Sequence, residues 1–136
     1  MMAQRRIMVD TNVLIRLLLE DEEQPQQVQA ARQLVIAVPE LYIPQVVQVE
    51  TVWVMENAYE IEKSVMIRLL THLDGNQTFL LQEAEIFHEA LQQYRISNVG
   101  FADCIILAQA KQLGITLYTF DKRLAKLEGA SSVPSL

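Results

Sequence analysis

Four acidic side chains stand where the surrounding sequence is apolar: Asp10, Glu50, Asp103 and Asp121. Asp10 and Asp121 directly follow short apolar runs, whereas Glu50 and Asp103 lie inside longer apolar stretches. A carboxylate in apolar surroundings loses hydration, which is costly unless it pairs with a cation or binds a metal. Four such positions in one short chain predict a shared cation site, with these residues as metal ligands and catalytic groups.

The donor types favour a hard divalent cation. Carboxylate oxygens suit Mg²⁺ or Mn²⁺, whereas a zinc site would draw on His and Cys. The two histidines, His72 and His88, are expected on exposed helix positions, and the single cysteine, Cys104, is expected in the core. A divalent cation relieves charge on a phosphate and activates water, so the predicted chemistry is hydrolysis of a phosphodiester.

Three polar residues close to these acids in sequence could hold a carboxylate or a metal-bound water in place: Thr11, Asn12 and Thr119. Simpler interpretations stay open for single positions. Asp10 and Asp121 could each be only the N-cap of a following helix, because Asp is favoured there. A lone acid such as Asp103 could instead pair with a lysine, and Lys111 is the nearest in sequence.

Hydrophobic periodicity predicts alternating strands and helices. The expected strands cover residues 6–9, 41–43, 78–81 and 115–120. The expected helices cover residues 12–19, 25–38, 45–59, 64–73, 84–94, 101–113 and 122–127. Pro25 suits a first helical turn, Pro39 stops that helix, and Gly114 is placed as a C-terminal cap.

This alternation predicts an α/β fold: a three-layer sandwich in which helices flank a central, mostly parallel sheet. In such sheets ligands bind beyond the carboxyl ends of the strands. Asp10 and Asp121 follow expected strands, while Glu50 and Asp103 lie in early turns of the two most apolar helices. We therefore expect all four acids to reach one cleft.

Length and composition are typical of a single domain spanning residues 1–136, because 51% of the 136 residues are apolar and Gly and Pro number only 4 each. No apolar run approaches the roughly 20 residues that a membrane helix requires. One cysteine excludes an internal disulfide, so a cytoplasmic setting is expected. The formal net charge of −6 argues against a simple electrostatic binder of nucleic acid, but not against a metal site that acts on one.

The four acidic segments resemble the motifs of PIN domains: Asp10-Thr11-Asn12-Val13, Glu50-Thr51-Val52-Trp53-Val54, Phe101-Ala102-Asp103 and Thr119-Phe120-Asp121. The chain is most similar to the small PIN ribonucleases that act as toxins in VapBC-type toxin–antitoxin pairs. The resemblance implies a parallel sheet flanked by helices, an acidic cluster that holds Mg²⁺ or Mn²⁺, and RNA as substrate. It also implies a cognate antitoxin that covers the acidic cleft.

Other functions remain to be weighed. A phosphatase with Asp10 as its aspartyl nucleophile usually has a second Asp two residues on, where this chain has Asn12. A non-catalytic PIN-like RNA-binding or scaffold domain would fit loss of an acid, and none is lost. The expected helices at 45–59 and 64–73 carry more apolar positions than one sheet face needs, so we expect a homodimer. Trp53 is expected in the core, and Met55 and Met66 in the core or at the dimer contact.

Overall fold

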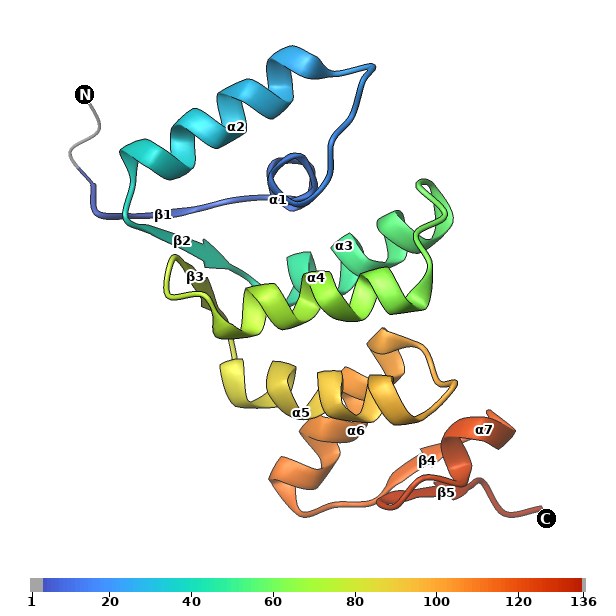
Figure 1. The fold of residues 1–136 in the computed structure, drawn as a ribbon. Helices are drawn as coiled ribbons and strands as arrows, with labels where there is room; N and C mark the ends of the chain where they lie inside the picture. The colour runs from blue at the N-terminus through green and yellow to red at the C-terminus, as the bar shows by residue number, and fades with distance from the viewer. Residues whose placement is uncertain (1–3, 136) are drawn as a thin grey trace. The chain divides into compact units, whose positions relative to one another are not determined.

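The computed structural model describes residues 4–135, so the ends of the expected 1–136 domain lie outside the described residues. The chain forms two compact units that divide between Ala84 and Glu85. Figure 1 labels the helices and strands of both units.

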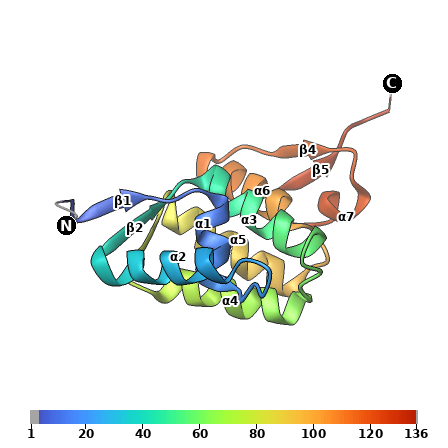
Figure 2. The same ribbon diagram turned by 90° about the horizontal axis from the view of Figure 1, so that it is seen from above.

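The first unit is a parallel βαβ arrangement. Its strands are β1 (Arg6–Met8), β2 (Glu40–Ile43) and β3 (Phe79–Leu81), in the order β1-β2-β3, with all neighbours parallel. Ile7 pairs with Leu41, and Leu41 in turn pairs with Phe79, so β2 is the central strand. Leu41 and Ile43 of β2 are fully buried. Figure 2 shows β1 and β2 side by side.

Four helices complete this unit: α1 (Thr11–Leu18), α2 (Pro25–Ala37), α3 (Gln45–Asn57) and α4 (Lys63–Gly75). Helix α1 packs against α2 and α3, and α4 packs against β3. Apolar side chains at helical spacing form the core, including Leu14 of α1, Val52 and Met55 of α3, and Met66 of α4. Burying each such side chain contributes on the order of 1.5–3 kcal/mol, so these faces fix the helices on the sheet.

The second unit begins with α5 (Ala84–Ile96) and α6 (Phe101–Leu113). Phe87 and Tyr94 of α5 each meet Phe101 of α6 edge to face, with ring centroids 5.6 and 5.7 Å apart. Such pairs are a preferred aromatic arrangement, and these three rings are buried. Gly114 caps α6 in the left-handed conformation with φ 71°, as its position in the sequence predicted.

After α6 the chain forms β4 (Leu117–Thr119), α7 (Lys122–Ala125) and β5 (Ala130–Ser132). Strands β4 and β5 are parallel and form a two-stranded sheet, with Leu117 paired to Ala130. The sequence had not predicted β5. Gly129 precedes it with φ 94°, and a Cβ there would lie 3.2 Å from the Lys111 side chain, so this turn favours glycine.

The α/β class is confirmed, because helices alternate with parallel strands. Within the described residues, no helix has both the length and the apolar character that crossing a membrane requires.

Candidate functional site

Asp10 lies at the junction of β1 and α1, as expected. The backbone N–H of Val9 donates to the Tyr42 carbonyl at 3.2 Å, which extends the pairing with β2 to the residue before Asp10. Asp10 is the N-cap of α1, and its Oδ1 accepts from the Val13 N–H at 3.1 Å. Its side chain is exposed, and its Oδ2 accepts no hydrogen bond from the described residues. The cap interpretation is therefore right, and a second oxygen stays open to solvent.

Glu50 extends outward from α3 and is tied to α1 by one hydrogen bond. The Thr11 hydroxyl donates to Glu50 Oε1. Thr11 is 8% exposed, whereas Glu50 is exposed. Because Thr11 follows Asp10 directly, this bond holds the Glu50 carboxylate beside the first turn of α1. Thr11 thus makes the kind of contact that the sequence had suggested for it.

The first turn of α3 is fastened to the ends of two strands by glutamines that the sequence analysis missed. Gln48 Nε2 donates to the carbonyls of Ile43 and Gln82, at 3.1 and 2.8 Å. The Gln45 N–H donates to Gln82 Oε1 at 2.7 Å. Ile43 ends β2 and Gln82 directly follows β3, so these bonds fix where α3 starts on the sheet edge. A buried glutamine inside an apolar helix was the available signal, because buried amides usually satisfy backbone groups.

Asp121 in the second unit repeats the geometry of Asp10. It is the N-cap of α7, and its Oδ1 accepts from the N–H groups of Arg123 and Leu124, at 2.8 and 2.9 Å. The Asp121 N–H donates to Thr119 Oγ1 at 3.0 Å. The Thr119 hydroxyl therefore helps to fix the turn that carries the Asp121 carboxylate. This contact goes beyond the role of a strand residue. Asp121 is exposed, so its Oδ2 remains accessible.

Asp103 occupies the first turn of α6 and is half-buried. Burial, and then the negative charge of Asp121, raise the pKa of the Asp103 carboxyl above its usual value. The two carboxylates of the second unit therefore repel each other in the absence of a cation. The alternative partner for Asp103 is not used, because Lys111 lies 3.9 Å from Glu89 instead.

In the first unit Glu50 is thus bonded to Thr11, the residue that follows Asp10, and in the second unit Asp121 acts electrostatically on Asp103. No group of three or more His, Cys, Asp or Glu side chains in residues 4–135 is arranged to hold a metal ion. The single cleft for all four acids stays a prediction. Asp10, Asp103 and Asp121 lie at helix starts, where the partial positive charge of the helix favours anionic groups.

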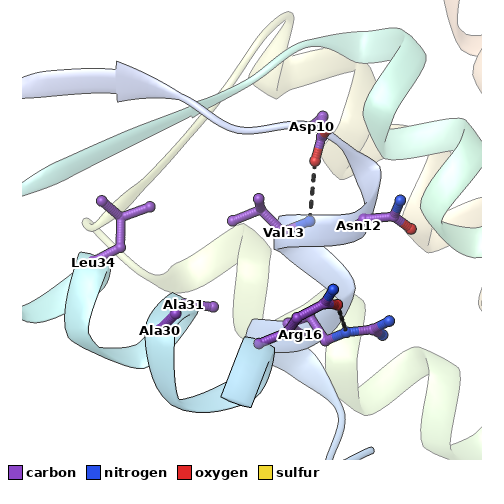
Figure 3. Close-up of a pocket in the computed structure, with 8 residues that line it drawn as sticks. Asp10, Asn12, Val13, Arg16, Ala30, Ala31 and Leu34 are labelled. Atoms are coloured by element: carbon purple, nitrogen blue, oxygen red, sulfur yellow. Dashed lines mark hydrogen bonds between the residues drawn. The ribbon is translucent and has the colours of Figure 1, made fainter. Parts of the chain in front are cut away.

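Asn12 is exposed and lines a pocket in the first unit, which Figure 3 shows between α1 and α2. The pocket has a volume of about 410 Å³. Asp10 lies at one side of it, and the side chains of Val13, Ala31 and Leu34 form apolar walls. A hollow therefore adjoins a carboxylate of the candidate site.

The exposure of single side chains agrees with all but one of the sequence predictions. His72 and His88 are exposed and Cys104 is buried, as expected. Met55 and Met66 are fully buried. The expectation for Trp53 was wrong, because it is 63% exposed. Helix α3 is apolar on nearly every side, so periodicity alone could not identify the face on which Trp53 lies.

Strands β1 and β4 each lead into a helix whose N-cap is an exposed aspartate, as in α/β proteins that bind ligands at their strand ends. The family model for the PIN domain matches residues 7–130, across both units. The chain therefore belongs to the PIN domain family.

Two known proteins are similar to this chain. A protein of Aquifex aeolicus (strain VF5) named VapC ribonuclease is 26% identical over 122 residues, which cover 88% of this chain and 90% of that protein. A solved structure described as a toxin–antitoxin complex from Klebsiella pneumoniae is 24% identical, with 90% of this chain and 93% of that chain covered. Its TM-score is 0.34, which is too low to support an argument.

Proposed function

We propose that this protein is an endoribonuclease that hydrolyses RNA phosphodiesters with Mg²⁺ or Mn²⁺ bound to Asp10, Glu50, Asp103 and Asp121. The observation that supports it best is that Asp10, Asp103 and Asp121 lie at the caps or in the first turns of α1, α6 and α7, and that Glu50 is hydrogen-bonded to Thr11 of α1. The PIN family model covers almost the whole of this chain. The name of the Aquifex relative supports a ribonuclease.

The residues fit a hard divalent cation. Asp10 and Asp121 each use only Oδ1 for capping, and Glu50 uses only Oε1, so each has an oxygen left for a ligand among the described contacts. Burial, and after it the negative charge of Asp121, raises the pKa of Asp103, and a divalent cation would relieve the repulsion between these two carboxylates. Oxygen donors without His or Cys favour Mg²⁺ or Mn²⁺ over zinc.

When bound, the metal supplies charge neutralisation at the phosphate and a water of lowered pKa. The chain's own residues supply position. The cap hydrogen bonds fix the orientation of the Asp10 carboxylate and, separately, that of the Asp121 carboxylate. The Thr11 hydroxyl fixes the Glu50 carboxylate. His72 and His88 lie on α4 and α5, which carry none of the four acids, so no histidine is assigned to proton transfer.

The biological setting we propose is that of a toxin in a toxin–antitoxin pair, acting in the cytoplasm. It rests on the resemblance of the acidic motifs to VapC-type toxins and on the name of the Aquifex relative. We also propose a homodimer, for which the exposed Val46 and Trp53 of α3 are candidate contact residues. Light scattering at high micromolar concentration tests the dimer, and a monomer there would contradict it. Co-purification with the product of the adjacent reading frame tests the antitoxin.

Cleavage of RNA by purified protein tests the proposed activity. Asp10→Asn, Glu50→Gln, Asp103→Asn and Asp121→Asn each remove one ligand charge while keeping side-chain shape, so each should reduce the rate at least about a hundredfold. Glu56→Gln is the matched control, because it makes the same change on the exposed side of α3. Folded variants that retain full activity, or wild-type protein that leaves RNA intact with either metal, would overturn the proposal.

A further inference from the structure

The pocket between α1 and α2 lies beside Asp10, which gives it a direct relation to the proposed site. Asp10, Asn12 and Arg16 of α1 line one side, and Gln27, Ala30 and Leu34 of α2 line the other. A volume of about 410 Å³ is within the range of pockets that hold small ligands. A chemical group in this pocket would adjoin whatever Asp10 binds.

Arg16 is held rigidly at the base of this pocket. Its Nε donates to Gln27 Oε1 at 2.9 Å, and its Nη1 donates to the Tyr59 hydroxyl at 2.8 Å. Nη1 also lies 3.4 Å from Asp21 Oδ2, to which the Tyr59 hydroxyl donates at 3.1 Å. The Arg16 side chain is only 13% exposed. A guanidinium fixed by its neighbours loses little freedom when it binds a ligand.

At the Arg16 and Gln27 end of the pocket, away from the Asp10 carboxylate, the polar atoms left over are donors. Because Gln27 Oε1 already accepts from Arg16, Gln27 presents its Nε2 donors. Arg16 keeps Nη2, which makes no hydrogen bond to the described residues. Figure 3 shows Arg16 below the apolar side chains of Val13 and Leu34. The pocket therefore combines apolar walls with donors, and a flat ligand with acceptor atoms on its edge would match it.

We propose that this pocket binds the base of a nucleotide next to the scissile phosphate, and that it prefers guanine or uracil over adenine or cytosine. This inference rests on the proposed ribonuclease function. Guanine presents acceptors at O6 and N7, and uracil presents carbonyl oxygens, whereas adenine and cytosine place an amino donor at the matching position. Single-stranded RNA is read in this way, by unstacked bases whose edges meet amides and arginine.

Gln27→Glu tests the proposed base preference. The new carboxylate still accepts from Arg16 Nε, but it replaces the Nε2 donors with an acceptor. Glu is also favoured in the first turn of α2, so the fold should persist. Cleavage of substrates that differ at one nucleotide next to the cut site should show a keto preference of at least about fivefold in the parent, and this preference should be lost or reversed in the variant.

Gln26→Glu is the matched control, because it adds the same charge one residue away, on an exposed position that does not line the pocket. It should lower affinity for RNA only through the added charge, and leave the base preference unchanged. The inference would be overturned if the parent, Gln27→Glu and Gln26→Glu all showed the same preference for keto bases, or none.

Ala30→Leu tests occupancy of the pocket without altering its polar groups. The longer side chain fills the space beside Arg16, and both residues are good helix formers, so stability should not change. KM for the preferred RNA should rise at least about tenfold, while Ala37→Leu, an exposed position of the same helix, should keep the parental KM.

The outcomes separate the two proposals. Parent protein that cleaves no RNA refutes the ribonuclease function, and the inference falls with it. Parent protein that cleaves RNA without a keto preference, or an Ala30→Leu variant with an unchanged KM, refutes the inference alone. An Ala30→Leu variant that weakens binding of a partner protein while cleavage stays normal would assign the pocket to a protein ligand instead.

Discussion

Two buried threonines on neighbouring elements should respond in opposite ways to the same substitution. Thr11 of α1 donates its hydroxyl hydrogen to Glu50, whereas the Thr51 hydroxyl of α3 is buried and has no partner within residues 4–135. Thr11 is 8% exposed and Thr51 is 1% exposed. Replacing either residue with Val keeps the shape of the side chain and removes only the hydroxyl.

The expected magnitudes follow from these environments. A hydrogen bond to a charged group contributes about 1.5–3 kcal/mol, but Glu50 is exposed and regains water when the bond is lost. We therefore expect Thr11→Val to lower the free energy of unfolding by about 1 kcal/mol. Thr51→Val removes a desolvated polar group without a partner, and should raise the free energy of unfolding by about 1 kcal/mol.

Urea denaturation of metal-free protein at neutral pH, followed by circular dichroism, measures both changes. The two variants should differ by about 2 kcal/mol, which corresponds to melting temperatures that differ by roughly 5–8 °C. A double-mutant cycle with Glu50→Ala is the decisive control, because Thr11→Val should then cost nearly nothing. An unchanged cost in that background, or a shift of both single variants in the same direction, would refute this account of the two hydroxyls.

Three further predictions concern charge and chemistry. Because the pKa of Asp103 is raised, its contribution to metal-free stability is full below its unfolded pKa, near 3.8, and is lost as pH rises through the folded value. Asp121→Asn keeps a cap oxygen but removes the repelling charge, so the urea midpoint of this variant should fall less between acidic and neutral pH than that of the parent. Asp121→Ala should lose the cap and destabilise the protein by about 1 kcal/mol. Millimolar Mg²⁺ or Mn²⁺ should raise the melting temperature of the parent more than that of Asp103→Asn, and equal shifts would count against carboxylate ligation. Cleaved RNA should end in a 3′-hydroxyl and a 5′-phosphate, since water is the proposed nucleophile; mass spectrometry that finds a 2′,3′-cyclic phosphate would contradict it.

Most helices and strands could be predicted from the sequence, because periodicity and the punctuating Pro and Gly residues act locally. Helix α6 begins and ends at the residues expected, since Gly114 favours the left-handed cap. Strand β5 was missed, because Ala130, Ser131 and Ser132 have neither the apolar nor the β-branched side chains that indicate a strand. Its pairing with β4 is a tertiary contact that no local sequence pattern indicates.

The site was predictable in its residue types and less so in its geometry. The acids Asp10 and Asp121 were identifiable both as caps and as candidate ligands, because both follow expected strands. The bond between Thr11 and Glu50 joins residues 39 positions apart, which only the folded chain reveals. The same holds for Arg16, whose ion pair with Asp21 and hydrogen bond to Tyr59 no local sequence pattern indicates.

The glutamine fastening at the start of α3 has a consequence for the order of folding events. Gln48 binds the carbonyls of Ile43 and Gln82, so its amide can find both partners only after β3 has paired with β2. Contacts that form late, after the transition state, change the rate of unfolding more than the rate of folding. The Gln48 amide should therefore form its hydrogen bonds after the strands have paired, and it should slow the unfolding of the start of α3 more than it speeds folding.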